Sequence, residues 1–224
     1  MIPGARLIIL GRQGAGKGTQ CVRLSRHYVV PHISTGEMLR ASVREGTELG
    51  VAAKEIMDSG GLVGDEIMIG IVDDRLSRDD ARTRGYILDG FPRTVKQAEA
   101  LFEITDRLRK PLDIVIDLDV PRDRVLERIT ARRVCRDCGT NYVAGPVDRR
   151  PWICDVCGGD VVQRDDDTPD AINQRLDLYE SQTSPLIEFY GELEMLVVID
   201  GVGHPDEVLD RLVNAIDQRR RPPA

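Results

Sequence analysis

Short apolar runs alternate with longer amphipathic stretches along most of the chain. The apolar runs predict buried strands at residues 6–10, 29–33, 86–89, 113–118 and 196–199. Between them, apolar residues spaced for one face of a helix predict helices at residues 17–27, 34–40, 48–59, 65–78, 94–109, 121–133, 168–190 and 205–219. Strands that alternate with helices are typical of a parallel sheet with helices on both faces, so we expect an α/β fold.

Two segments interrupt this alternation. Residues 34–63 are helical throughout, and residues 131–167 contain turns, short apolar runs and four of the five cysteines. We interpret both as insertions in a single domain that covers residues 1–224. Ligands of parallel sheets bind at the carboxyl ends of the strands, which is where the Gly-rich turn after residue 10 and Asp89 lie.

A Gly-rich turn follows the first predicted strand and leads directly into a helix. Its spacing, Gly11-x-x-x-x-Gly16-Lys17, is typical of a phosphate-binding loop whose backbone N–H groups surround an anion. The helix N-terminus and Lys17 add positive charge, which favours this interpretation over an inert turn. The residue after Lys17 is Gly18, and the hydroxyl comes one position later at Thr19. We therefore expect another side chain to help hold magnesium.

Four cysteines form two Cys-x-x-Cys pairs, which are Cys135 with Cys138 and Cys154 with Cys157. This spacing is typical of a tetrahedral site in which all four ligands are protein sulfurs, so the metal would be structural. Zinc is the expected ion and iron an alternative, while two disulfides are the competing interpretation. The fifth residue, Cys21, lies on the first predicted helix and is interpreted as a packed core thiol.

Composition and charge narrow the functional classes. The chain has 224 residues, is 41% hydrophobic and carries a formal net charge of −7. This acidic balance argues against general nucleic-acid binding and against attraction to an anionic membrane surface. No signal peptide or apolar run of membrane-spanning length is apparent, so we expect a cytoplasmic location.

Five motifs in order resemble the adenylate kinase family, in its long-lid, zinc-binding bacterial form: Gly11 to Thr19, Ser34 to Arg40, Asp89 to Thr94, Ala131 to Arg133 and Gln163 to Asp166. The resemblance covers nearly the whole chain. It implies a P-loop nucleoside monophosphate kinase core, an NMP-binding segment at 34–63 and a lid at 131–167. It also implies the magnesium-dependent reaction ATP + AMP ⇌ 2 ADP, and we expect a monomer.

The resemblance assigns residues to three overlapping sets. The ATP-binding set is Gly14, Ala15, Gly16, Lys17, Gly18, Thr19, Arg132, Asn141, Tyr142 and Gly203. The AMP-binding set is Thr35, Arg40, Gly61, Leu62, Val63, Gly90, Phe91, Pro92, Arg93, Gln97, Arg164 and Arg175. The catalytic set is Lys17, Asp89, Arg93, Arg128, Arg132, Arg164 and Arg175, with Asp89 expected to orient magnesium-bound water.

Two alternatives to this function remain open at this stage. Another nucleoside monophosphate kinase would use GTP as donor or a different acceptor, although the long lid and Thr35 favour AMP over pyrimidine monophosphates. A non-enzymatic, nucleotide-regulated module with a zinc ribbon is the second alternative, which the acidic balance disfavours. The three histidines, His27, His32 and His204, are interpreted as structural or surface residues.

Overall fold

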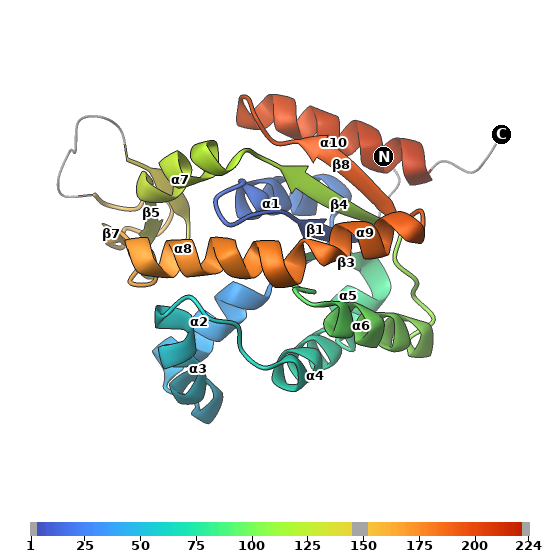
Figure 1. The fold of residues 1–224 in the computed structure, drawn as a ribbon, viewed down its shortest axis with the longest axis horizontal. Coiled ribbons are helices and arrows are strands. Elements are labelled where there is room, and N and C mark those ends of the chain that lie inside the picture. The colour runs from blue at the N-terminus through green and yellow to red at the C-terminus, as the bar shows by residue number, and fades with distance from the viewer. Residues whose placement is uncertain (1–3, 145–151, 221–224) are drawn as a thin grey trace.

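A parallel sheet forms the centre of the molecule (Figure 1). The computed structural model describes residues 4–144 and 152–220, and within them the sheet has five strands in the order β2-β3-β1-β4-β8. These strands are β1 (Ala5–Leu10), β2 (His32–Ser34), β3 (Gly85–Asp89), β4 (Ile114–Asp119) and β8 (Leu196–Asp200). All four neighbouring pairs are parallel. The predicted α/β class with a parallel sheet is therefore confirmed.

Helices cover both faces of this sheet (Figure 1). Alternation along β1 divides the core: Leu7 and Ile9 pack on one side, while Ile8 and Leu10 pack on the other. The first side is covered by α1 (Lys17–Tyr28), α7 (Arg122–Thr130), α8 (Pro169–Leu178) and α10 (Pro205–Arg220). The second side is covered by α2 (Thr35–Glu45), α3 (Glu48–Asp58), α4 (Asp65–Leu76), α5 (Asp79–Arg84), α6 (Val95–Arg107) and α9 (Pro185–Glu192).

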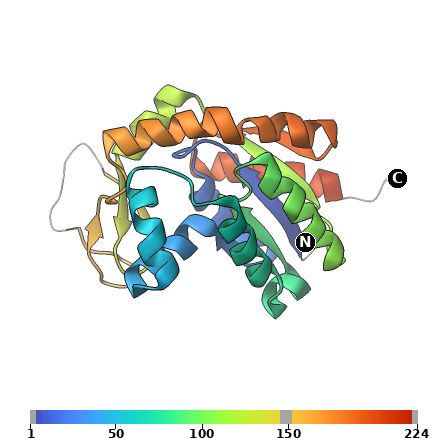
Figure 2. The ribbon, with the colours of Figure 1, turned by 60° about the horizontal axis from the view of Figure 1, so that its bottom comes forward.

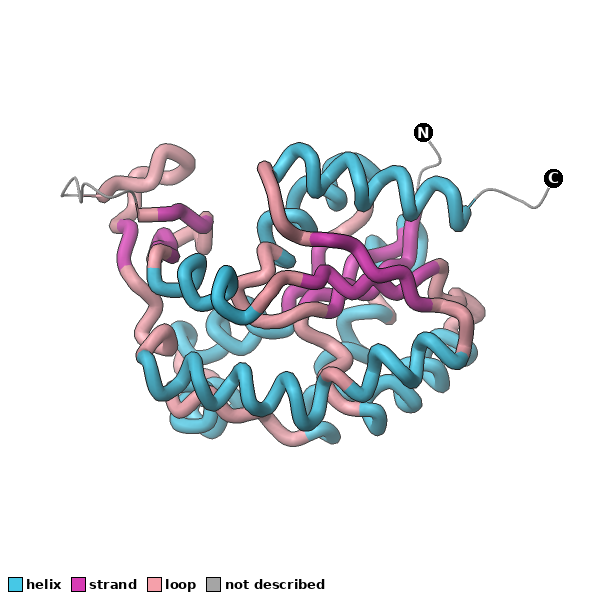
Figure 3. Tube along the Cα trace, turned by 45° about the horizontal axis from the view of Figure 1, so that its top comes forward, coloured by secondary structure: helices cyan, strands magenta, loops and turns pink. Residues whose placement is uncertain are grey.

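The cysteine-bearing segment forms a small antiparallel sheet of its own. Its strands are β5 (Arg132–Cys135), β6 (Asn141–Val143) and β7 (Val161–Val162), in the order β6-β5-β7 among the described residues. Figure 3 shows these strands at one end of the molecule, apart from the strands of the central sheet. Part of the segment predicted as the lid, residues 145–151, lies outside the described residues.

Two predicted elements have wrong boundaries. The helix predicted at 121–133 ends at Thr130, because Arg132 instead pairs with Val143 as the first residue of β5. The strand predicted at 29–33 begins only at His32. Val29 caps α1 in a left-handed conformation with φ 57°, and the next amide, Val30 N, bonds back to Ser25. Tertiary pairing and capping, rather than local hydrophobicity, set these boundaries.

Two further elements differ from the predicted pattern. The single helix predicted at 168–190 contains a π-helical turn, η1 (Tyr179–Thr183), which ends two residues before Pro185. Proline has no amide hydrogen to donate, and Ser184 N bonds to Tyr179 O in the wider π pattern. Helix α5 was not predicted, because only Ala81 is buried and its other residues give no apolar face. No helix in the described ranges is long and apolar enough to span a membrane.

Candidate active site

The Gly-rich turn lies at the carboxyl end of β1 and opens directly into α1. Gly14 has φ 83°, and a Cβ atom there would lie 2.6 Å from a side-chain carbon of Ile129, so only glycine fits. The Lys17 ammonium curls back and donates hydrogen bonds to the carbonyls of Gly11 (2.6 Å) and Arg12 (2.9 Å). Burial lowers the pKa of Lys17, although nearby Asp89 opposes this change. The Lys17 ammonium therefore lies against the Gly-rich turn, where a bound phosphate would need a cation.

Asp89 ends β3 directly beside the start of α1. Its Oδ2 lies 3.2 Å from His32 Nε2, and a Cβ added to Gly18 would come within 3.7 Å of the same oxygen. Burial raises the pKa of Asp89, but the contact with His32 and the charge of Lys17 outweigh it and leave the pKa below the usual range. Asp89 is thus an ionised carboxylate in the place where Gly18 offers no hydroxyl. His32 was expected to be structural or on the surface, and its contact with Asp89 was not predicted.

Five arginines face the same region from different elements. Arg93, after β3, donates from Nε to the carbonyl of Gly90 at 2.9 Å. Burial lowers the pKa of Arg93 to about 10, and the positive charges of Arg175 and Arg40 lower it too. Burial, followed by Arg40 and Arg132, likewise lowers the pKa of Arg164 to about 10. These guanidinium groups stay protonated at neutral pH and repel one another, which favours a site for anions.

Two buried carboxylates at the second lid hinge hold two of these cations. Asp167 pairs with Arg132, whose Nε donates to Oδ2 at 2.8 Å. Asp166 accepts a hydrogen bond from the Arg175 guanidinium at 2.6 Å. Asp166 and Asp167 are only 6% and 2% exposed, so both ion pairs are sheltered from water. Their role was not predicted, although their position after Arg164 in an Asp-rich run is a signal that could have indicated it.

A carboxylate on α2 connects the two insertions. Glu37 pairs with Arg40 on its own helix at 2.6 Å and with Arg164 of the lid at 3.1 Å. Figure 2 shows α2 and α3 beside the lid strands. The Nε atoms of Arg40 and Arg164 are buried and have no hydrogen-bond partner within the described structure. Such donors are costly to leave unpaired, which indicates that an additional acceptor, such as a phosphate oxygen, belongs between them.

The residues expected around AMP line the other side of this region. Thr35 donates its hydroxyl to the carbonyl of Gly90 at 2.9 Å, which joins α2 to the turn after β3. The Gln97 side chain accepts from Arg93 N at 2.8 Å and donates to Asp65 at 2.8 Å. Asp65 therefore holds the Gln97 side chain that fixes this turn, whereas the sequence predicts Asp65 only as the first residue of a helix. The remaining residues of this set are Gly61, Leu62 and Val63, which follow α3, and Phe91 and Pro92, which follow Gly90.

Some of the residues expected around ATP contact the Gly-rich turn or the arginine cluster, and one contacts the cysteine cluster. Arg128 donates to the carbonyls of Ala15 (3.0 Å) and Gly201 (3.1 Å), so it joins the Gly-rich turn to the loop that contains Gly203. Asn141 accepts a hydrogen bond from Arg164 at 3.3 Å. Tyr142 directs its hydroxyl at the cysteine cluster instead. The assignment of these residues to the nucleotide stays a prediction.

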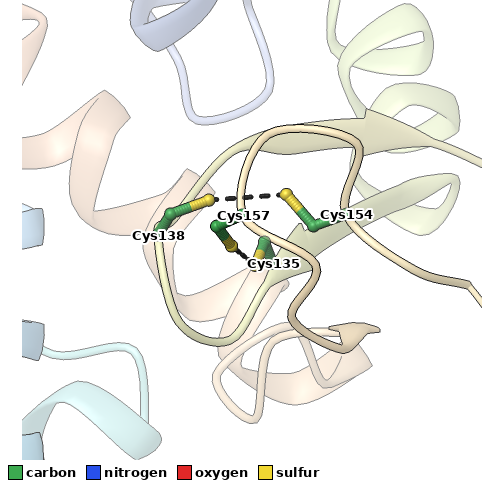
Figure 4. A group of neighbouring side chains, drawn as sticks. All are labelled: Cys135, Cys138, Cys154 and Cys157. Carbon is green, nitrogen blue, oxygen red and sulfur yellow. Dashed lines mark hydrogen bonds between the residues drawn. The ribbon is translucent and has the colours of Figure 1, made fainter.

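The four lid cysteines meet at one point (Figure 4). Their sulfurs all lie within 4.8 Å of one another, with Cys135 and Cys157 3.4 Å apart and Cys138 and Cys154 3.5 Å apart. Disulfide sulfurs lie about 2 Å apart, and all four cysteines are free. Four sulfurs about 2.3 Å from one ion would lie roughly 3.8 Å apart, so the cluster fits a tetrahedral metal such as zinc.

The turns on the two sides of this cluster repeat one geometry. Gly139 N donates to Cys135 O at 3.0 Å, and Gly158 N donates to Cys154 O at 2.9 Å. Both glycines have positive φ, 75° and 78°. In addition, the Tyr142 hydroxyl donates to the Cys154 sulfur at 3.2 Å. Backbone and side chain thus orient the sulfurs toward one point, as a second shell does around a metal.

Comparison with known proteins agrees with this geometry. The family model described as adenylate kinase matches residues 9–195. The adenylate kinase of Methanosarcina mazei is 52% identical over 197 residues, which cover 87% of this chain and 90% of that protein. That of Methanococcoides burtonii is 46% identical over 213 residues, which cover 95% and 98%. That of Caldicellulosiruptor bescii is 49% identical over 197 residues, which cover 88% and 91%. A chain with this fold, this arrangement of cations and these relatives belongs to the adenylate kinase family.

Proposed function

We propose that this chain carries out the reaction of its family, the reversible transfer of the terminal phosphoryl group of ATP to AMP, which gives two ADP molecules. One observation supports this most strongly. Cations from the Gly-rich turn, the helical insertion and the lid converge, and two of them, Arg40 and Arg164, have buried Nε donors without a partner. A single phosphate would not need cations from three segments, whereas two nucleotides that meet end to end would.

The donor phosphates would bind in the Gly-rich turn. Its backbone amides and Lys17 would hold the β- and γ-phosphates, and Arg128 would brace the turn through Ala15. Arg132, at the first lid hinge, would reach the same phosphates when it exchanges Asp167 for a phosphate oxygen. The attacking oxygen of AMP is already anionic, so the transfer needs positioned cations rather than a general base.

The acceptor phosphate would lie between Arg40 and Arg93, with Arg164 and Arg175 bridging to the donor. Arg93 is fixed for this by Gly90 and by Gln97, which holds its backbone amide. Thr35 and the segment from Gly61 to Val63 would contact the base and ribose. Closer contact between the lid and α2, which already meet at the Glu37–Arg164 pair, would exclude water, which would otherwise accept the phosphoryl group.

Two metals complete the proposal. Magnesium, bound with ATP, supplies charge neutralisation on the phosphates, and Asp89 is the ionised carboxylate that would orient its water ligands. Zinc at Cys135, Cys138, Cys154 and Cys157 would be structural, since no ligand position stays open. We further propose a cytoplasmic monomer, because every residue of the proposed site comes from one chain and the cysteines are free.

Replacement of Lys17 tests the enzymatic part directly. We expect Lys17→Met to lower phosphoryl transfer about 1,000-fold or more, because the cation over the β- and γ-phosphates is lost. Lys54→Met is the matched control, since Lys54 is an exposed residue of α3 that pairs only with Asp58 among the residues described. Retention of wild-type transfer by Lys17→Met would contradict the assignment.

A panel of donors and acceptors tests the choice of nucleotides. We expect AMP to be the preferred acceptor and ATP the preferred donor in a coupled assay. Faster transfer to UMP or CMP, or from GTP, would make the chain another nucleoside monophosphate kinase. Absence of transfer to every monophosphate would overturn the enzymatic proposal. Sedimentation at the assay concentration measures the molecular mass in solution. A mass above that of one chain would contradict the proposed monomer.

A further inference from the structure

Three side chains with metal-binding atoms meet beneath the Gly-rich turn, away from the four lid cysteines. They are Cys21, His32 and Asp89, and their ligand atoms all lie within 4.8 Å of one another. Each comes from a different element: α1, β2 and β3. A thiol, an imidazole and a carboxylate form a ligand set that zinc accepts and magnesium does not favour.

The fold brings these groups together for a simple reason. In the parallel pair of β2 and β3, Ser34 is the partner of Asp89, and His32 lies two residues before Ser34 on the same face. Helix α1 packs on this face of the sheet, where Cys21 lies one turn after Lys17. The imidazole and the carboxylate are therefore diagonal neighbours, and the thiol faces them from the helix above.

The Cys21 thiol has no hydrogen-bonding task of its own. Its side chain is 0% exposed, and none of the hydrogen bonds found among the described residues uses its sulfur. His32 and Asp89 are 18% and 13% exposed at their side chains, so the group can be reached from solvent on their side. The thiol is thus an unpartnered, buried ligand that points into a group with an opening.

The distances require little rearrangement for a tetrahedral ion. Ligands about 2.0–2.3 Å from one zinc ion lie roughly 3.3–3.7 Å apart, and His32 Nε2 and Asp89 Oδ2 are already 3.2 Å apart. The sulfur needs to approach by about 1 Å at most, within the reach of a rotamer adjustment. Three protein ligands would leave the fourth position for water or a phosphate oxygen. Lys17 opposes the ion by its charge, but the carboxylate and the thiolate together offset that repulsion.

We propose that Cys21, His32 and Asp89 form a second metal site, which takes a thiophilic divalent cation of the zinc class and inhibits the enzyme when filled. Binding breaks the S–H bond of Cys21, forms a sulfur–metal bond and releases one proton to solvent, with no change of oxidation state. Inhibition follows because the same ion occupies the Asp89 oxygen that would orient magnesium-bound water. The inhibitory effect rests on the proposed function of Asp89, whereas the binding of the ion does not.

Binding is tested on the full-length protein with its lid metal already in place. Cd²⁺ is the probe, because sulfur–cadmium bonds absorb in the ultraviolet. We expect the wild-type protein to gain one more sulfur–cadmium signal per chain than Cys21→Ala, and His32→Gln to bind Cd²⁺ at least tenfold more weakly than wild type. His27→Gln is the matched control, because His27 lies on α1 but is not one of the three ligand side chains, and this variant should behave as wild type. Equal signals from wild type and Cys21→Ala, with both folded by circular dichroism, would overturn the site.

Inhibition is tested with Zn²⁺ at saturating Mg²⁺ and nucleotides. We expect Cys21→Ala to keep the uninhibited rate and to need at least tenfold more Zn²⁺ for half-inhibition than wild type. The same half-inhibiting concentration in both proteins would overturn the inhibitory role. If the wild-type protein transferred no phosphoryl group at all, the proposed function would fail, and the Cd²⁺ signal alone would still decide the site.

Discussion

The two insertions of this protein contain cations for the same region but are stabilised by different means. In the helical insertion, Leu39, Ala53 and Val63 belong to the same apolar cluster as strand residues of the central sheet. The lid has a separate cluster, whose buried members are Cys135, Cys154 and Val161 with Tyr142 and Trp152 packed against them. So small a cluster cannot offset the entropy of ordering the segment. The comparison indicates that an insertion continuous with the core needs no metal, whereas an isolated one does.

Loss of one lid sulfur should have the largest effect. We expect Cys154→Ala to lower phosphoryl transfer by about 100-fold or more, because the lid unfolds and no longer positions Arg132 and Arg164. The helical insertion and the sheet should stay folded, as measured by circular dichroism and a thermal melt. Val156→Thr is the control in the same turn, at a side chain that is 68% exposed. If Cys154→Ala kept full activity and an unchanged metal content, the lid would not depend on its metal. The two insertions would then not differ in how they are stabilised.

Truncation of the apolar face of α2 should have an intermediate effect. Leu39 is 7% exposed in the core cluster, so Leu39→Ala should lower the free energy of unfolding by about 2–4 kcal/mol, as urea denaturation measures it. The content of lid metal should not change. Glu45→Ala, at an exposed position at the end of the same helix, should change stability by less than about 0.5 kcal/mol. Loss of metal in Leu39→Ala would mean that the two insertions fold as one unit.

Neutralisation of the carboxylate between the insertions should have the smallest effect. Glu37 is 40% exposed at its side chain, and its pairs with Arg40 and Arg164 should contribute at most about 1 kcal/mol each to stability. Without its charge the incoming phosphate no longer competes with Glu37 for Arg40 and Arg164, so Glu37→Gln should lower the KM for AMP about twofold to fivefold. Steady-state kinetics with varied AMP measure this. A KM raised tenfold would show instead that Glu37 is needed to assemble the site.

The same comparison explains what could be predicted from the sequence. The strands of the sheet, the Gly-rich turn and the cysteine pairs were predicted, because each depends on local spacing that the sequence displays. The lid strand that begins at Arg132 was not, since its partners are Val143 and Val162, whose pairing has no local signal. The π-helical turn was not predicted either, although Pro185 follows it, and its Tyr179 and Thr183 side chains bond to the distant Asp117 and Arg93.

The site shows the same limit. Arg40, Arg93, Arg132 and Arg164 lie in the quoted motifs, and Arg175 was named from the family resemblance, but their counter-charges could not be named. Asp166, Asp167 and Glu37 are separated from some of their partners by 35 to 127 residues, and acidic residues are common on any surface. The contact of His32 with Asp89 likewise depends on the register of β2 against β3. Pairings of this kind become visible only when the fold is known.

Hydrogen–deuterium exchange of the protein with and without its lid metal tests the difference between the insertions most directly. We predict that chelation removes protection from amides of β5, β6 and β7, while amides of α2, α3 and β1 keep theirs. Equal protection of the lid strands before and after removal of the metal would contradict the account.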